Sequence, residues 1–428
     1  MGRLIVVGTR FDPCRNSLIR SVRPTYFARP GLPTKTQSGL QVDGSSCYDP
    51  PMQVALVRRK IDPLGGGAER YAARLGRWLA SGGHEVTLIC QQIDDTLRKE
   101  DLQIVQLPRV RTPQWTKATA FAAQAETAVA AKPYDFVFGL SAIPCSDLVR
   151  VSEGIHRHYL QERYGSSLLG SLQNINPRHR ALGQLEDEVF RLPSRRRFIV
   201  QCQLDRFLLH HHFDVADERI TVLANGVDTD LFRPVSNSHL KAKQPGPIRL
   251  LFAAASNFRR KGLRELIQAI AILRDHEAQL HIAGPINRAY QRLAREWRVD
   301  DRVQFLGLRH DMQALYAVSD LVIAPSIYEP FPNVVLESLA CGTPVVTTVS
   351  NGAAEAIQHG HNGFLIGESQ PRAIAEGIEE FLGLSEEERV LMRERSRAGA
   401  LERSWQSHFA RLERVIQRNA KEETANER

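Results

Sequence analysis

Two glutamates in the C-terminal third of the chain carry the clearest chemical signal. Glu329 and Glu337 have seven residues between them, in a stretch that begins Tyr-Glu-Pro-Phe-Pro-Asn and ends Ala-Cys-Gly-Thr-Pro-Val-Val. The two prolines stiffen a loop, and Asn333 is expected to begin a helix that Gly342 ends. Glu329 should therefore lie in a loop facing a cleft, with Glu337 little more than one turn into the helix. Carboxylates accept hydrogen bonds from the paired hydroxyls of a ribose or a sugar ring. Taken alone, each glutamate is equally well interpreted as an ordinary solvated carboxylate.

A basic loop supplies the complementary charge. The run Ser-Asn-Phe-Arg-Arg-Lys-Gly at 256–262 lies between a predicted strand and a predicted helix. Cations beside a helix N-terminus, whose free N–H groups also attract anions, form a suitable site for a diphosphate. We assign this role to Arg260 and Lys261, with Arg259 as a third candidate. A solvated basic turn is the alternative, and the acidic pair weighs against it.

A run of three glycines, Gly65, Gly66 and Gly67, precedes a predicted helix. The run forms neither a Walker motif nor a GxGxxG motif. Three consecutive glycines forfeit much chain entropy, which favours a close approach of the backbone to a ligand over a simple tight turn. Their position at a helix start suits the phosphates of a donor.

The elements that must position these residues alternate between strands and helices, as in a parallel sheet covered on both faces. Before the basic loop, the sequence predicts a helix over 68–81 and strands over 54–57, 86–90 and 136–138. The same pattern restarts after a polar bridge at 234–247, with a helix over 262–274 and strands over 248–254, 280–283, 303–306, 321–324 and 345–348. A charged helical tail is expected over 385–419. Two consecutive doubly wound units place ligands in the cleft between them.

These motifs resemble those of the retaining glycosyltransferases of family 4, in which an acidic pair of this spacing precedes a small-Gly-x-Pro-Val turn. Further similar segments are Asn-Gly-Val-Asp at 225–228, Asn-Gly-Ala-Ala-Glu at 351–355 and Gly-His-Asn-Gly-Phe-Leu at 360–365. The resemblance extends from Met52 to the C-terminal helices. It implies an α/β protein of GT-B fold, with two Rossmann-like doubly wound domains that face each other across a cleft.

The resemblance implies a role for each matching residue. Glu337 would hold the ribose of a nucleotide-sugar donor, and Glu329 would contact hydroxyls of the donor sugar near the reacting carbon. Arg260 and Lys261 would stabilise the departing diphosphate, which is electrostatic catalysis. Other donor contacts are expected from Arg259, Gly66, Gly67, Asn333 and Val334, and from the backbone N–H groups of Gly352 and Ala353.

By the same resemblance the chain divides into four parts. Residues 1–51, rich in Pro, Gly, Ser and Arg, are expected to form a disordered extension, and the strand directly after Met52 points to an upstream start site as its origin. Residues 52–234 would form the acceptor domain, and residues 235–400 the nucleotide-sugar-binding domain. Residues 401–428 would form a helix that packs back on the first domain.

Within the family, the loops at 65–67, 139–144 and 257–262 are most similar to those of enzymes that add glucose to the lipopolysaccharide core. This similarity implies transfer of a hexose to that core or to a similar glycolipid or glycan acceptor, with UDP-glucose ahead of other UDP-hexoses and GDP-mannose as donor. Glu153 stands where these relatives carry an aspartate near the reacting sugar, so its role stays open. His156 and His158 are either general bases for the acceptor hydroxyl or surface histidines.

The bulk properties favour a cytoplasmic protein with an anionic partner. The chain has 56 basic and 48 acidic residues, a net charge of +8. No zinc-finger spacing, RNP signature or aromatic-plus-basic stripe indicates nucleic acid. The residues from His156 to Arg197 mix cations, aromatics and leucines, which suits either peripheral contact with an anionic membrane or solvated helix faces. Six scattered cysteines without a CxxC pair, and the lack of a signal peptide or membrane-spanning run, favour the cytoplasm.

Two other functions stay open on the residues alone. A glycoside hydrolase would use Glu329 and Glu337 as acid and base, but it leaves the basic loop unexplained. A non-catalytic nucleotide-sugar-binding subunit would keep the donor site, and the departure at Glu153 allows it. No metal or other cofactor is expected. Asp228-Thr229-Asp230 mimics a metal-binding DxD, but it belongs to the Asn-Gly-Val-Asp turn, and the family resemblance implies a reaction without a bound metal.

Overall fold

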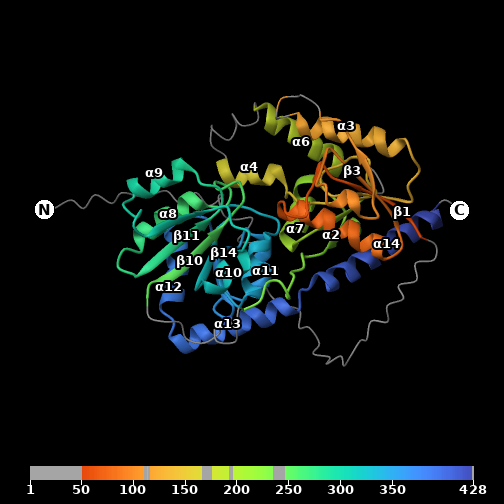
Figure 1. Cartoon of the computed structure of the whole chain (residues 1–428). Coiled ribbons are helices and arrows are strands. Elements are labelled where there is room, and N and C mark those ends of the chain that lie inside the picture. Colours follow the sequence, from red (N-terminus) through yellow and green to blue (C-terminus); the bar gives the residue numbers. More distant parts are fainter. Residues whose placement is uncertain are drawn as a thin grey trace, which may run out of the picture.

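The computed structural model describes residues 51–109, 113, 116–165, 176–191, 196–234 and 246–426 (Figure 1). Two parallel β-sheets with helices packed around them lie side by side and account for most of these residues. Residues 1–50, which belong to the predicted disordered extension, lie outside the described part of the chain.

The first sheet has seven parallel strands in the order β5-β3-β1-β6-β7-β8-β9. Its strands are β1 (Gln53–Val57), β3 (Glu85–Cys90), β5 (Gln103–Gln106), β6 (Phe136–Gly139), β7 (Leu148–Arg150), β8 (Arg197–Val200) and β9 (Ile220–Val222). All four residues from Val54 to Val57 are fully buried. A continuous apolar run of this kind is expected for a central strand that is covered on both faces.

Alternate residues of β1 pack on opposite faces of this sheet. Val54 and Leu56 join a core with α2 (Gly67–Ser81), whereas Ala55 and Val57 join a core with α3 (Lys117–Ala130). The remaining helices of the first unit are α4 (His156–Tyr164), α6 (Pro177–Phe190) and α7 (Gln203–Phe213), and a short pair, β2 (Lys60–Ile61) and β4 (Gln92–Ile93), follows β1 and β3. The helix α2 begins directly after the glycine run, with Gly66 as its N-cap.

The second sheet has six parallel strands in the order β12-β11-β10-β13-β14-β15. Its strands are β10 (Ile248–Ala253), β11 (Ala278–Ala283), β12 (Val303–Gly307), β13 (Leu321–Ala324), β14 (Val345–Thr348) and β15 (Gly363–Ile366). One face packs on α8 (Leu263–Ile272), α9 (Arg288–Glu296) and α12 (Pro371–Leu382), and the other on α10 (Met312–Val318), α11 (Asn333–Ala340) and the 3-10 turn η5 (Gly352–Ala356). The pattern predicted from the sequence is therefore confirmed in both units.

The charged tail predicted to be helical over 385–419 is made of two helices. It forms α13 (Glu386–Leu401) and α14 (Trp405–Asn426). Helix α13 ends where the chain pairs with another segment. Val227 N–H donates to Arg403 O at 2.8 Å, which ties residues 403–404 to the Asn-Gly-Val turn. A Cβ at Gly226 would stand 2.7 Å from the Trp405 backbone, so this turn needs its glycine for close packing. Helix α14 then lies along α2 in Figure 1, and its buried residues Phe409, Leu412 and Ile416 join the core of the first sheet.

Candidate active site

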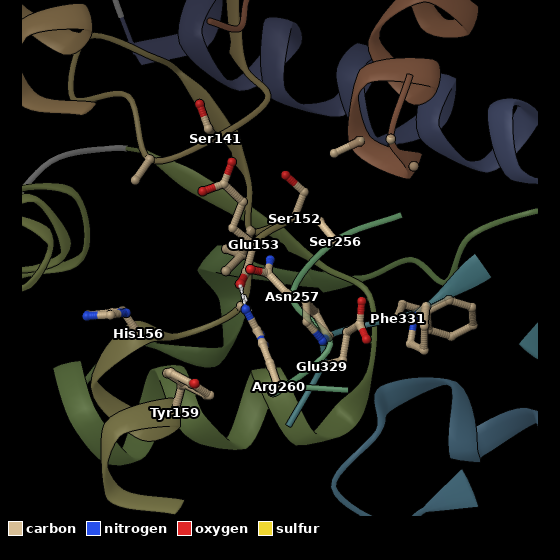
Figure 2. Close-up of a pocket in the computed structure, with 18 of the residues that line it drawn as sticks. Ser141, Ser152, Glu153, His156, Tyr159, Ser256, Asn257, Arg260, Glu329 and Phe331 are labelled. Carbon is tan, nitrogen blue, oxygen red and sulfur yellow. Dashed lines mark hydrogen bonds between the residues drawn. The ribbon is translucent and has the colours of Figure 1, made fainter. Parts of the chain in front are cut away.

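A cavity of about 920 Å³ lies between the two units. Its walls are the loops that follow β1, β6 and β7 of the first sheet and those that follow β10 and β13 of the second. Both sheets thus present the carboxyl ends of their strands to the cavity, which is where open parallel sheets bind ligands. Figure 2 shows side chains from both units converging on this space.

Glu329 and Lys261 form an ion pair on the wall of the second unit. Lys261 Nζ donates to both carboxylate oxygens at 2.7 Å, and Ser326 Oγ donates to Glu329 Oε2 at 3.1 Å. Burial acts to raise the pKa of Glu329, but the charges of Lys261 and Arg260 hold that pKa below its ordinary value. Glu329 is therefore ionised at neutral pH. The general acid of a glycoside hydrolase needs a raised pKa, so Glu329 is not suited to that role.

Arg260 reaches across the cavity and ties the two walls together. Its Nε donates to Tyr328 O at 2.7 Å, and both terminal nitrogens lie 3.3–3.4 Å from Glu153 O, the contact drawn in Figure 2. The guanidinium also lies over the rings of Tyr159 and Tyr328, at 5.2 and 5.4 Å from their centroids. The sharp turn after this loop requires Gly262, which has φ +76° and whose added Cβ would collide with a backbone oxygen.

Glu337 also lies between the two units. Tyr316 Oη donates to Oε2 at 3.0 Å from inside the second unit, and Arg70 Nη2 donates to Oε1 at 3.2 Å from the first turn of α2. The Glu337 side chain is only 9% exposed. A carboxylate with about four acceptor positions keeps about two free here, enough for two hydroxyls of one ring.

The other predicted donor-contact residues that face the ligand space line the same cavity. An added Cβ at Gly67 would stand 3.1 Å from Asn333 Nδ2, whereas one at Gly66 would meet nothing within 4 Å. Gly67 thus permits close contact between the units, and Gly66 borders open space. Asn333 Oδ1 accepts from Asn225 Nδ2 at 2.7 Å. Val334 and Arg259 also line the cavity.

The expectation for Gly352 and Ala353 is not met in this structure. Neither residue lines the cavity, and both are buried. Gly352 N–H donates to Glu329 O at 2.8 Å, and Ala353 N–H donates to Asn351 Oδ1 at 3.0 Å. These N–H groups are used because residues 352–356 form the turn η5, against which the Glu329 loop packs. Gly352 thus supports the Glu329 loop, and the N–H of Ala353 is used within the turn.

Glu153 and His156 line the cavity from the first unit, but His158 does not. The Glu153 side chain is 68% exposed, with Arg58 Nη2 at 3.5 Å, and its carboxylate points away from Arg260 in Figure 2. Burial and the neighbouring His179 lower the pKa of His156 to about 4. His158 is 5% exposed and packs edge-on against Tyr328, and burial lowers its pKa to about 3. His158 is thus a core residue.

Tyr328 is a part of the site that the sequence reasoning missed. Its ring is fully buried in a core of the first unit, although it belongs to the loop of the second. Its hydroxyl donates to Asp205 Oδ1 at 2.7 Å and accepts from Ile155 N–H at 2.9 Å. Gly154, with φ +75°, leaves no room for a Cβ against this ring. The signal in the sequence was an aromatic residue directly before Glu329, in the loop expected to face the cleft.

Arg70 was missed as well, because nothing in its local sequence distinguishes it from the other arginines of α2. Its contact with Glu337 joins residues far apart in the chain. Within the described ranges, no group of three or more His, Cys, Asp or Glu side chains is arranged to hold a metal ion. No helix in the same ranges is long and apolar enough to cross a membrane.

The chain matches two family models in the order of its two units. Residues 65–231 match "Glycosyltransferase Family 4", and residues 247–383 match "Glycosyl transferases group 1". The protein therefore belongs to glycosyltransferase family 4 and is a transferase of GT-B fold.

Curated relatives extend this assignment. The chain is similar to the lipopolysaccharide glucosyltransferase WaaG of Escherichia coli, 25% identical over 327 residues, which are 74% of this chain and 86% of WaaG. A probable transglycosylase of Burkholderia thailandensis is 30% identical over 304 residues, 68% of this chain and 77% of the relative. A D-inositol 3-phosphate glycosyltransferase of Pseudarthrobacter chlorophenolicus is 30% identical over 244 residues, 54% and 57% of the two chains.

Solved structures confirm the fold. A crystal structure of WaaG superposes with a TM-score of 0.73 at 23% identity, covering 85% of this chain and 99% of WaaG. The Anabaena protein HepE in complex with UDP-glucose superposes with a TM-score of 0.65 at 18% identity, covering 86% of this chain and 99% of HepE.

Proposed function

We propose that this protein is a retaining hexosyltransferase that moves glucose from UDP-glucose to a lipopolysaccharide core or a similar glycolipid or glycan acceptor. The observation that carries the proposal is the group of Lys261, Glu329 and Arg260, which gathers cations and an ionised carboxylate on the cavity wall facing Glu153. The similarity to a lipopolysaccharide glucosyltransferase, and to a protein solved with UDP-glucose, supports the choice of donor and acceptor.

The donor would lie mainly on the second unit. Glu337 would accept hydrogen bonds from the ribose hydroxyls at its free acceptor positions, beside Arg70 and Tyr316. An ammonium has three donors, and Glu329 takes two of those of Lys261, so the third can reach a phosphate oxygen. Arg260 and Arg259 would add charge beside the same diphosphate.

In the proposed reaction, the bond between C1 of glucose and the phosphate oxygen breaks, and its electron pair leaves with UDP. The acceptor oxygen forms its bond to C1 on the same face, so the anomeric configuration is kept, and its proton passes to the departing phosphate oxygen. Arg260 and Lys261 would stabilise the charge that grows on that phosphate. Glu329 would orient the sugar through a hydroxyl, while Glu153 and Arg58 border the acceptor side.

We further propose that no bound metal takes part, because Arg260 and Lys261 already offer positive charge to the diphosphate.

We also propose that the protein is cytoplasmic and makes peripheral contact with an anionic membrane. The net charge of +8 supports that contact. We expect the protein to float with anionic liposomes and to lose this binding in high salt. Equal recovery of the protein with neutral liposomes would contradict the proposed contact.

Donor binding tests the core of the proposal. UDP-glucose, UDP-galactose, UDP-N-acetylglucosamine and GDP-mannose should be compared by thermal shift. A ligand at about 100 times its Kd stabilises a protein by about 2.7 kcal/mol. We expect UDP-glucose to stabilise the wild type most, and Glu337→Gln and Lys261→Met to lose most of the shift. The control is Glu376→Gln, an exposed glutamate on α12 outside the cavity.

Product analysis tests the reaction itself. The purified protein, UDP-glucose and a deacylated heptose-containing core oligosaccharide should yield an α-glucoside, as read from the anomeric coupling in NMR. A β-linked product would rule out retention. Stabilisation by none of the donors would reject the donor site.

A further inference from the structure

The cavity lining carries a large excess of positive charge. Ten arginine and lysine side chains line it, against five glutamates. The internal segments outside the described residues, 110–112, 114–115, 166–175, 192–195 and 235–245, contain no Asp or Glu that could reduce this excess. A cleft lined by one sign of charge concentrates ligands of the opposite sign.

The glutamates are already engaged. Lys60 pairs with Glu69, Arg58 with Glu153, Arg70 with Glu337 and Lys261 with Glu329. The fifth, Glu186, accepts from the backbone N–H groups of His156 and Arg157. Six cations remain. Arg259 and Arg260 belong to the second unit and stand beside the proposed diphosphate site, whereas Arg59, Lys117, Arg150 and Arg178 all belong to the first unit.

Arg150 is the most telling of these four. It lines the cavity floor at the end of β7, yet it is only 2% exposed. It donates to the neutral oxygens Gln201 Oε1 at 2.8 Å and Asn225 Oδ1 at 2.5 Å, and its guanidinium lies 3.8 Å from the centroid of the Tyr71 ring. Its Nε has no hydrogen-bond partner, and no carboxylate within the described residues pairs with it. A buried cation without a counter-charge is costly unless a ligand supplies one.

Lys117 and Arg178 extend this charge along the same wall. Each stands in the first turn of a helix, α3 and α6, whose N-terminal N–H groups also favour anions. Neither has a carboxylate partner among the described residues. Arg178 adjoins His179, whose Nδ1 is 3.0 Å from His156 Nε2, and the charges of Arg178 and Arg260 both act on His156. Arg178 thus lies close to His156, which lines the same cavity.

We propose that the acceptor carries a phosphate or carboxylate group next to its reacting hydroxyl, and that Arg150, Lys117 and Arg178 of the first unit bind that group. The inference rests on the proposed function, because it concerns the acceptor half of the same cavity. A donor alone does not account for these cations, since the proposed diphosphate site lies with Arg259 and Arg260 of the second unit.

The test uses the full chain saturated with UDP, so that the donor half is filled. The probes are three forms of one deacylated heptose-containing core oligosaccharide: intact, dephosphorylated with hydrofluoric acid, and carboxyl-reduced. Binding is measured by calorimetry, and transfer from UDP-glucose is measured in parallel. We expect one of the two modified forms to bind about ten-fold more weakly than the intact form, which is the usual size for the loss of a charge-assisted hydrogen bond. Which form weakens identifies the group as phosphate or carboxylate.

Variants locate the group on the wall. Arg178→Gln should weaken binding of the intact oligosaccharide about ten-fold and leave binding of the weakened form unchanged. The matched control is Arg180→Gln. Arg180 is an exposed arginine two residues further along α6, and it does not line the cavity. Arg150→Gln tests the buried member of the group. If that variant fails to fold, Lys117→Gln tests the same wall at an exposed position. UDP affinity should stay constant throughout.

The experiment separates failure of the anionic acceptor subsite from failure of the proposed donor site. Equal binding of all three forms, or no measurable binding of any form to the UDP-saturated protein, would overturn the anionic acceptor subsite and leave the transferase proposal standing. Failure of UDP and UDP-glucose to bind the wild type would instead reject the proposed donor site.

Discussion

Replacing Tyr328 by phenylalanine tests how the two units are joined at the active site. The substitution keeps the ring and removes one buried hydroxyl, which donates to Asp205 Oδ1 at 2.7 Å and accepts from Ile155 N–H at 2.9 Å. Asp205 and Ile155 are both fully buried, so water cannot replace the lost partner. Leaving a buried polar group unsatisfied costs about 1–3 kcal/mol. With two partners affected, we expect Tyr328→Phe to lower the free energy of unfolding by about 2–5 kcal/mol.

The decrease in the free energy of unfolding caused by Tyr328→Phe should depend on pH. Burial raises the pKa of Asp205 to about 6, and the Tyr328 hydroxyl opposes that rise. Because the folded pKa lies above the unfolded value, Asp205 favours the fold below the unfolded pKa, and this contribution is lost as pH rises through about 6. Removing the hydroxyl raises the pKa further, so the variant should lose more stability at about pH 8 than at about pH 5. The other groups that act on Asp205 are Cys202, Arg260 and Glu355.

Urea unfolding at both pH values measures this effect. Tyr159→Phe is the control, since that tyrosine also lines the cavity but its hydroxyl makes no hydrogen bond to the part of the chain that the structure describes. We expect this control to change the free energy of unfolding by less than about 0.5 kcal/mol. Combining Tyr328→Phe with Asp205→Asn should remove most of the pH dependence. A loss below about 0.5 kcal/mol for Tyr328→Phe, equal at both pH values, would refute the reasoning.

Three further predictions concern other parts of the molecule. Gly154→Ala should lower the urea midpoint by an amount equivalent to about 1–3 kcal/mol, because φ is +75° and the new Cβ would press on the Tyr328 ring; an unchanged midpoint would contradict this. Phe409→Ala should cost about 3–5 kcal/mol by opening a cavity between α14 and α2, and a loss under about 1 kcal/mol would mean that α14 is not part of this core. Transfer should proceed equally in EDTA and in magnesium, and loss of turnover in EDTA would show that Arg260 and Lys261 do not replace a metal.

Local chemistry made several elements predictable from the sequence. The strands at 321–324 and 345–348 and the start of α11 at Asn333 agree with the structure, because the strands are continuous apolar runs and Pro332 stands at the helix start. The position of the basic loop was predictable for the same reason. It follows the strand β10, at the edge where an open α/β sheet gathers its ligands.

What the sequence could not reveal is which distant residues meet. The break between α13 and α14 falls at residues 403–404, which pair with a turn near residue 227. Gly352 and Ala353 use their N–H groups internally, and no local pattern distinguishes that from ligand binding.

The amino-acid sequence by itself determined the two doubly wound units, the family and the residue types of the proposed donor site. Only the tertiary structure decided that Tyr328 is buried in the opposite unit, that Arg70 pairs with Glu337, and that Arg150 has no carboxylate partner among the described residues. Periodicity and turn chemistry act over a few residues and can be read along the chain. Ion pairing and burial depend on contacts between segments far apart in sequence, and these exist only once the two sheets have packed together.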